Sequence, residues 1–80
     1  MADTRTRRRG FKIRKFQGTE KIGVGVESFE ELKRKGAAIF GLKFSMCHIQ
    51  LVDGTQVLDG NFLSTLEEQT ILEFVDDRGG

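Results

Sequence analysis

The chain has 80 residues, of which 38% are hydrophobic and 31% are charged, and its formal net charge is +1. A chain of this length forms one domain, and a single core uses up its apolar residues, which leaves few for a deep substrate pocket. The lone cysteine, Cys47, excludes an internal disulfide and a zinc site with several thiolates. No apolar run is long enough to span a membrane, and the N-terminus is charged where a secretory signal needs an apolar stretch. We therefore expect a cytoplasmic or nuclear protein that is not bound to a membrane.

The near-zero net charge conceals a separation of charge along the chain. Basic residues crowd the first half: Arg5, Arg7, Arg8, Arg9, Lys12, Arg14, Lys15, Lys21, Lys33, Arg34, Lys35 and Lys43. Acidic residues fill the second half: Asp53, Asp59, Glu67, Glu68, Glu73, Asp76 and Asp77. If the fold keeps the halves apart, the surface is dipolar, as in proteins that pair by charge. The alternative is that both halves are merely solvated.

The first third of the chain indicates a flexible arm followed by two strands. Residues 1–8 show no apolar periodicity, and we predict a flexible basic arm there. Apolar and charged residues alternate over 11–14, and alternation returns over 22–26 after a turn, as in two half-buried strands of a hairpin. Gly23 and Gly25 lie on the outer face of the second strand, which suggests a bulge or a close backbone approach.

A helix is predicted to begin at Ser28 and to end at Gly41. The Ser28 hydroxyl and the Glu31 carboxylate form a capping box, in which each satisfies a free backbone amide of the first turn. Gly36 lies on the apolar face, where a missing side chain lets the helix lie close to a sheet. The large apolar residues predicted on that face at helical spacing are Phe29, Leu32, Ile39 and Phe40.

The second half predicts three further strands, at 47–52, 56–58 and 70–75, with a tight turn between the first two at Asp53-Gly54-Thr55. A short helical turn is expected over 61–66. Its inward residues are expected to be Phe62, Leu63 and Leu66. The order strand, strand, helix, strand, strand, short helix, strand fits an α+β fold of the ubiquitin-like β-grasp roll type, a mixed sheet with one main helix and one short helix.

No pattern for catalysis, a cofactor or a metal ion is present. Cys47 and His48 are adjacent, but neighbours in a strand point to opposite faces and cannot readily form a thiol–imidazole pair. The sequence also contains no glycine-rich phosphate loop and no metal-ligand spacing. The paired acids at 67–68 and 76–77 are better explained as surface charges.

Two alternative functions remain open at this point. The arginine run at Arg7, Arg8 and Arg9 can bind nucleic acid through phosphates, although no aromatic residues interleave with it, because the phenylalanines occupy core-facing positions. The Gly79-Gly80 end resembles that of a ubiquitin-like modifier, but residues 75–78 lack ubiquitin's apolar and basic tail.

Three stretches read together resemble the CIDE-N domain of apoptotic DNA-fragmentation proteins. They are Phe11-Lys12-Ile13-Arg14, then Lys21 through the Ser-capped helix to Gly36, and finally Leu51-Val52-Asp53-Gly54-Thr55-Gln56-Val57 with the later Phe62, Leu66 and Thr70. The resemblance covers nearly all of residues 9–75 and is nearest to the caspase-activated nuclease subunit, with insect relatives and the fat-droplet members also open. PB1 domains share the fold and charge pairing, but this chain lacks their longer acidic motif. We thus expect a domain over 9–76 and a flexible end at 77–80.

The resemblance implies homotypic association between a basic and an acidic face. By position, the resemblance implies Lys12, Lys21 and Lys35 on the basic face, with Arg9 and Arg14 as their neighbours. On the acidic face it implies Asp53 and Asp59, with Glu67 and Glu68 nearby. The expected partner is the CIDE-N domain of an inhibitor or nuclease subunit, or a second copy joined head to tail into a filament. No small molecule is expected, nucleic acid is not expected for this domain, and any nuclease chemistry lies elsewhere in the parent protein.

The sequence departs from the family pattern on the acidic side. Many members carry an acid where this chain has Val52, and two or three consecutive acids where it has Asp59-Gly60-Asn61. The acidic face is therefore depleted, which favours a more acidic partner over self-assembly.

Overall fold

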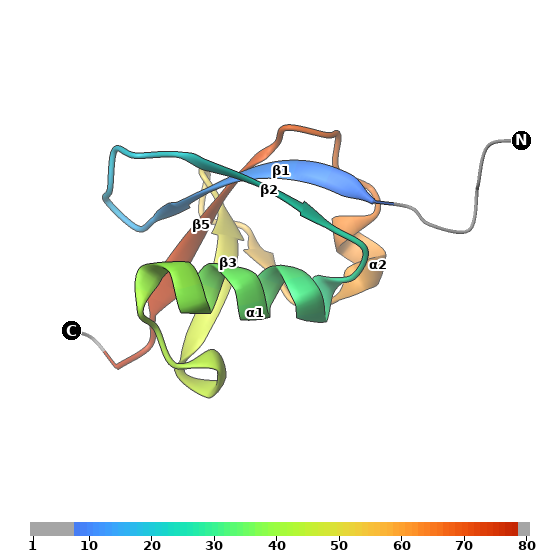
Figure 1. Ribbon diagram of the computed structural model, residues 1–80. Coiled ribbons are helices and arrows are strands. Elements are labelled where there is room, and N and C mark those ends of the chain that lie inside the picture. Colours follow the sequence, from blue (N-terminus) through green and yellow to red (C-terminus); the bar gives the residue numbers. More distant parts are fainter. Residues whose placement is uncertain (1–7, 79–80) are drawn as a thin grey trace, which may run out of the picture.

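The computed structural model describes residues 8–78, which form a mixed five-stranded sheet with one long helix across one face (Figure 1). The helical segments are α1 (Phe29–Phe40), a 3-10 turn (Phe44–Met46) and the single-turn α2 (Gly60–Leu63). The strands are β1 (Arg9–Lys15), β2 (Ile22–Val26), β3 (Cys47–Leu51), β4 (Gln56–Val57) and β5 (Ile71–Asp76). The predicted ubiquitin-like fold is thus confirmed, and only the 3-10 turn was not anticipated.

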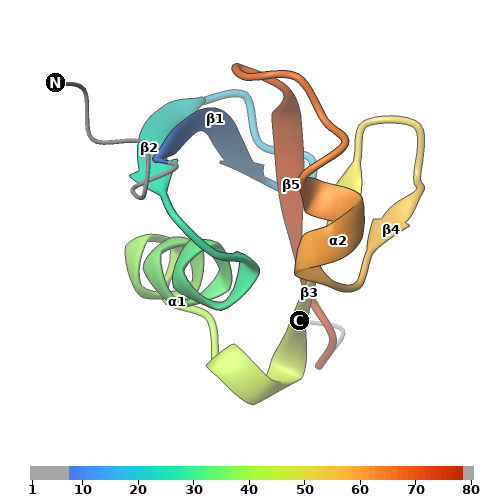
Figure 2. The same ribbon diagram turned by 90° about the vertical axis from the view of Figure 1, so that its right-hand side faces the viewer.

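The sheet order is β2-β1-β5-β3-β4, so the first and last strands of the chain lie side by side at its centre. β1 runs parallel to β5, with Ile13 opposite Leu72, and every other neighbouring pair is antiparallel. The parallel pair requires the chain to cross over, and α1 makes that crossing. Consequently β2 and β4 are the two free edges, on opposite sides of the molecule (Figure 2).

The core lies between the sheet and α1. Alternating residues of each strand point toward the helix, as the period of two in the sequence predicts. The largest fully buried side chains are Phe11, Phe74, Ile13, Leu32, Ile49, Leu72, Val26 and Val57. The other face of the sheet is open and carries the polar residues of the same strands.

Gly36 sets the distance between α1 and the sheet. A Cβ atom added at Gly36 would lie 2.1 Å from the Phe74 ring, far inside van der Waals contact. Phe40, one turn later, meets the same ring with centroids 5.7 Å apart. The predicted close approach of the helix at Gly36 is therefore confirmed, and its counterpart is Phe74.

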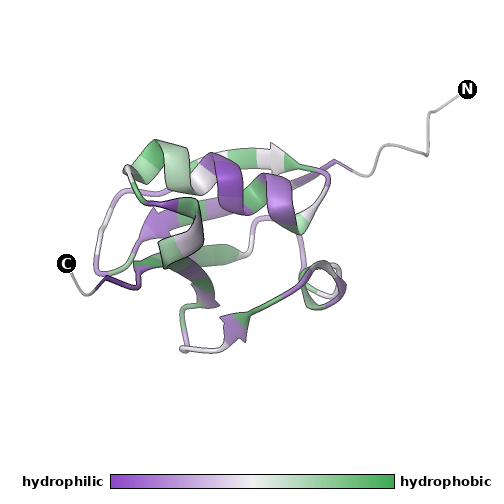
Figure 3. Ribbon diagram, turned by 90° about the horizontal axis from the view of Figure 1, so that it is seen from below, coloured by the Kyte–Doolittle hydropathy of each residue, from purple (hydrophilic) through white to green (hydrophobic). Residues whose placement is uncertain are grey.

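Both predicted ends of α1 are also present. Ser28 Oγ accepts a hydrogen bond from the Glu31 amide at 3.1 Å, and Glu31 Oε1 accepts one from the Glu27 amide at 2.8 Å. Gly41 ends the helix in the left-handed conformation with φ 71°, which glycine adopts at little cost. Figure 3 shows that hydrophilic residues gather in the first turns of α1 and hydrophobic ones in its last.

Three predictions about which side chains face inward are wrong. Ile39 is 46% exposed, because Gly36 and Phe40 mark the centre of the buried face and Ile39 lies to one side of it. Phe62 is 37% exposed, and within the single turn of α2 only Leu63 is buried. Phe16 and Phe44 are exposed as well, so the phenylalanines do not all occupy core positions.

The predicted basic arm at 1–8 lies outside the described residues except for Arg8, and the predicted flexible end at 77–80 lies outside them at 79–80, where the diglycine falls. The domain boundaries therefore stay predictions.

Candidate protein-interaction surface

The sheet order places the β3–β4 turn, with Asp53, at the edge opposite β2 (Figure 2). Of the predicted basic residues, Arg9, Lys12 and Arg14 lie on β1, Lys21 directly precedes β2, and Lys35 lies on α1. Asp59 lies between β4 and α2, whereas Glu67 and Glu68 precede Gln69, whose amide donates to the Gly10 carbonyl of β1. We call these two sets of residues the basic end (Arg9, Lys12, Arg14, Lys21 and Lys35) and the acidic end (Asp53, Asp59, Glu67 and Glu68).

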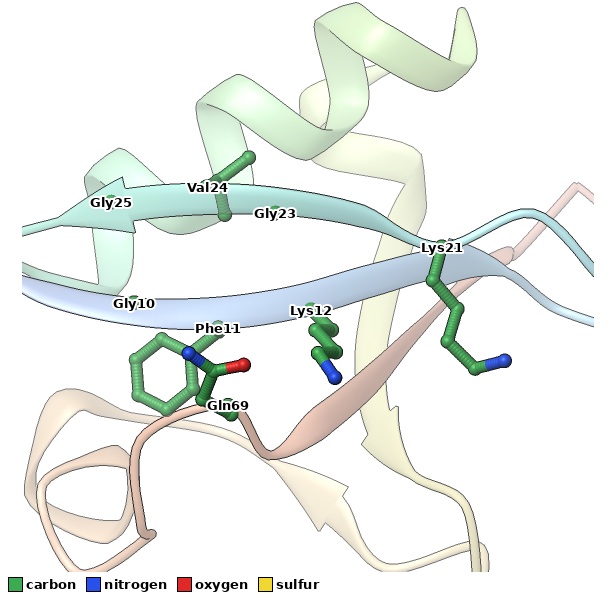
Figure 4. Close-up of a pocket in the computed structure, with 8 residues that line it drawn as sticks. All are labelled: Gly10, Phe11, Lys12, Lys21, Gly23, Val24, Gly25 and Gln69. Atoms are coloured by element: carbon green, nitrogen blue, oxygen red, sulfur yellow. The ribbon is translucent and has the colours of Figure 1, made fainter.

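A shallow hollow of about 470 Å³ lies at the basic end, on the sheet face turned away from α1 (Figure 4). Its lining consists of Gly10, Phe11, Lys12, Lys21, Gly23, Val24, Gly25 and Gln69. Gly10 pairs with Gly25 and Lys12 with Gly23 across the β1–β2 ladder. Three of these four outward positions have no side chain, so the floor of the hollow is bare backbone.

Lys12 and Lys21 flank this hollow, and both are exposed. Their side chains form no ion pair or hydrogen bond with any of residues 8–78. Lys35 reaches the neighbouring edge from α1, where Nζ donates to the Gly25 carbonyl at 2.9 Å and lies 3.3 Å from Glu31 Oε2. The structure thus brings Lys12, Lys21 and Lys35 together around β2, with Lys35 partly neutralised.

The Arg9 side chain makes its contacts within the domain. Its guanidinium donates to the Ser64 carbonyl at 3.0 Å and also to the Leu66 carbonyl, both at the end of α2. The same group lies over the Phe11 ring, 5.4 Å from the centroid. These contacts tie β1 to α2 and leave Arg9 few donors for a partner.

Arg14 is likewise occupied within the fold. Its Nε donates to Glu73 Oε2 at 3.0 Å, its terminal nitrogen binds the same oxygen, and Gln50 Nε2 donates to Glu73 Oε1 at 3.0 Å. Glu73 is only 5% exposed. Burial alone would raise the pKa of Glu73, but the hydrogen bonds from Gln50 and Arg14 and the charge of Arg14 outweigh it, and the pKa is lowered. Arg14 therefore compensates a buried carboxylate.

Each aspartate of the acidic end uses one oxygen to hold local backbone. Asp53 Oδ1 accepts from the Thr55 amide at 2.9 Å within the β3–β4 turn, and this bond lowers the pKa of Asp53. Asp59 Oδ1 caps α2 by accepting from the Phe62 amide at 2.9 Å. The second oxygen of each remains available. Glu67 and Glu68 are exposed in the loop before β5.

Two exposed apolar residues at the acidic end were missed from the sequence. Val52 is 58% exposed and Leu58 is 70% exposed, and they directly precede Asp53 and Asp59. Both were assigned to strand ends, but β3 stops at Leu51 and β4 at Val57. The sequence feature that could have indicated their exposure is an aliphatic residue directly before an aspartate, in Val52-Asp53 and again in Leu58-Asp59.

The remaining candidate chemistry is not supported by the geometry. Cys47 is buried, which raises the pKa of its thiol, while His48 faces the opposite side of β3 and contacts the Asp77 carboxylate. The part of the chain that the structure describes holds no group of side chains suited to bind a metal ion. Across residues 8–78, no helix is long and apolar enough to cross a bilayer.

Residues 8–78 thus form a small ubiquitin-like domain whose exposed charged side chains suit contacts with another protein. A family model of the CIDE-N domain matches residues 8–78. The chain therefore belongs to the CIDE-N domain family, and the family predicted from its motifs is confirmed.

Solved structures agree with this assignment. The DREP2 CIDE domain superposes with a TM-score of 0.78 at 34% identity and covers 86% of this chain and 89% of that one. The Drep4 CIDE domain gives 0.76 at 34% identity, covering 84% and 78%. The heterodimeric complex between the CAD domains of CAD and ICAD gives 0.71 at 28% identity, covering 88% and 80%. No curated protein gives a significant match.

Proposed function

We propose that this domain pairs with another CIDE-N domain by setting its basic end against the partner's acidic end. The observation that supports the proposal is the location of Lys12 and Lys21 beside β2 and of Asp53 in the β3–β4 turn at the opposite edge of the same sheet. Lys12 and Lys21 supply the attraction, and Lys35 contributes by exchanging its contact with Glu31 for one with the partner. That two CAD domains form a heterodimer in a related structure supports pairing between domains of this kind.

Such a contact depends on several weak charges acting together. Each exposed ion pair contributes about 0–1 kcal/mol, so no single pair holds the complex. Together they orient the partners, speed their encounter and reject a partner with like charge. Screening acts over about 8–10 Å at ordinary ionic strength, and the association should weaken as salt is raised.

The acidic end of the same domain remains available when the basic end is occupied. A contact between two different surfaces of identical copies is head to tail, and it extends into an open filament unless it closes into a ring. We propose this assembly, with itself or with an inhibitor or nuclease subunit, as a regulatory step in apoptotic DNA fragmentation. The free thiol of Cys47 fits a cytoplasmic or nuclear setting.

The experiment is molar mass by light scattering against concentration, at low and at high salt. The test variant is Lys12→Glu/Lys21→Glu. The control is Lys43→Glu, which makes one such charge reversal at an exposed residue between α1 and β3. We expect the native domain and the control to grow beyond a dimer at low salt, and both the test variant and high salt to keep the domain monomeric.

Growth that survives the lysine reversals would contradict the assignment of the basic end. A native monomer under every condition would contradict self-pairing, and the more acidic CIDE-N partner would then take its place in the same titration.

A further inference from the structure

The hollow at the basic end has glycines that the fold itself does not need. A Cβ atom added at Gly23 would have no atom within 4 Å, and one at Gly25 would meet only the Arg8 side chain at 3.4 Å. Neither residue has the positive φ that favours glycine. Glycine weakens a strand because it loses more conformational freedom and packs nothing. The close backbone approach predicted at Gly23 and Gly25 is therefore absent from residues 8–78: the space above Gly23 is open, and only the Arg8 side chain lies over Gly25.

The β3–β4 turn is a rigid projection at the other end of the domain. The Leu51 amide donates to the Thr55 carbonyl at 2.7 Å, and the Gly54 amide donates to the Leu51 carbonyl at 2.9 Å. The bond from the Thr55 amide to Asp53 closes the turn on its other side. Val52 is held exposed next to Asp53, so its side chain is placed to meet another surface together with that carboxylate.

We propose that the glycine-floored hollow receives the β3–β4 turn of a second copy of this chain, with Val52 against the floor and Asp53 against Lys12 and Lys21. The inference rests on the proposed function and specifies the contact within it. The charges are complementary, since two lysines without a described partner flank the hollow and the free oxygen of Asp53 stands beside Val52. The two surfaces lie at opposite sheet edges, so one copy can offer its turn while its own hollow is filled.

This arrangement gives the turn an apolar contact as well as a charged one. Val52 stands directly before Asp53, the one acid of the turn. Burial of a valine side chain against bare backbone adds apolar contact that salt does not screen. Lys12 and Lys21 then favour an acidic partner, and the shape of the hollow favours a partner whose β3–β4 turn fits it.

The test uses two variants of the full chain that can form only one contact. The acid-end copy carries Lys12→Ala/Lys21→Ala and keeps its turn. The base-end copy carries Asp53→Asn/Glu67→Gln/Glu68→Gln and keeps its hollow, with Asn retaining the acceptor that closes the turn. Their affinity is measured by titration calorimetry, and the melting temperature of every variant is recorded.

Gly23→Val in the base-end copy should weaken binding about tenfold or more by filling the hollow, and Gly23→Ala should weaken it less. Its melting temperature should be unchanged or higher, since the side chain meets open space and valine favours strands. Val52→Ser in the acid-end copy should weaken binding about tenfold. Once Gly23→Val is present, Val52→Ser should have no further effect. Leu58→Ser, the matched control at the other exposed aliphatic residue, should change affinity by less than about twofold, since it lies outside the contact.

The outcomes separate the two proposals. We call the acid-end and base-end copies without further substitution the native pair. If the native pair binds and salt weakens that binding, but Gly23→Val leaves the affinity unchanged, the proposed function stands and the hollow contact is wrong. If both substitutions weaken binding but their effects add, Val52 does not enter the hollow and the inference is overturned. If the native pair fails to bind at all, self-pairing and the hollow contact fail together.

Discussion

The two ends of this domain use charge in different ways. At the basic end, Arg9 and Arg14 give their donors to the domain itself, and Lys12 and Lys21 are left to face a partner. At the acidic end, each aspartate supports its own turn with one oxygen and still presents the other. Residue type alone gives no sign of which of these charged side chains are used within the domain and which remain for a partner.

The difference follows from the chemistry of the groups. If a guanidinium that binds a buried carboxylate moves away, the carboxylate is left buried with an unpaired charge. Arg14 therefore stabilises the fold and is not available to a partner. A carboxylate has two oxygens and several lone pairs, so it can cap a helix and receive a lysine together. Ammonium groups on long flexible stems cost little to redirect, which suits Lys12, Lys21 and Lys35 to a transient contact.

The largest expected effect is on folding itself, and it would disrupt the basic and the acidic end together. Both ends depend on the packing of α1 at Gly36 against Phe74. Gly36→Val places atoms inside the Phe74 ring, and the backbone cannot yield without moving α1 off the sheet. We expect a loss of at least about 3 kcal/mol, a large part of the stability of a domain this size. Circular dichroism during urea unfolding measures it. Ala38→Val, at an exposed position of the same helix, should cost less than about 1 kcal/mol. Equal losses would show that the close approach at Gly36 is unimportant.

The next effect distinguishes the arginine that belongs to the fold from the lysine that does not. Arg14→Ala leaves Glu73 and its negative charge without their main partner, and we expect a loss of about 2–3 kcal/mol in unfolding free energy. Lys12→Ala, at the neighbouring outward position of β1, should change stability by less than about 0.5 kcal/mol. The same urea titration serves for both. If Lys12→Ala is more destabilising than Arg14→Ala, our assignment of Arg14 to the fold and of Lys12 to partner binding is wrong.

The pH dependence of that pair gives a sharper test. In the native domain the folded pKa of Glu73 is lowered, so its contribution is present above the ordinary glutamate pKa near 4.5 and is lost as pH falls through the folded pKa. In Arg14→Ala, burial should raise the pKa, and protonation then favours the folded state as pH falls. The stability difference between the two proteins should therefore shrink between about pH 7 and pH 3. A difference that is constant with pH would mean that Arg14 acts through packing alone.

Local signals in the sequence predicted the fold well, and contacts between distant residues explain the rest. The Ser28 cap, the Gly41 end and the alternation of β1 each depend on neighbours along the chain, and each is confirmed. The role of Arg14 depends on Glu73, which lies 59 residues away and joins it only because β1 and β5 run side by side. The family likeness matched Lys12 by position and added Arg14 only as a neighbour on the same face, and nothing in the sequence indicated that Glu73 binds Arg14. The exposure of Ile39 similarly depends on where the helix meets Phe74.

The smallest effect separates the two uses of one aspartate. Asp59→Ala removes both the cap of α2 and a charge, and it should cost about 1 kcal/mol of stability. Asp59→Asn keeps an acceptor for the Phe62 amide and should cost little, while it removes the same charge. If the acidic end works as proposed, both variants should weaken association at low salt to the same small extent, and only Asp59→Ala should melt earlier. Glu67→Gln is the control that changes charge without a cap, and it should match Asp59→Asn in both measurements. An Asp59→Asn protein that associates like the native domain would restrict Asp59 to capping and leave the attraction to Asp53, Glu67 and Glu68.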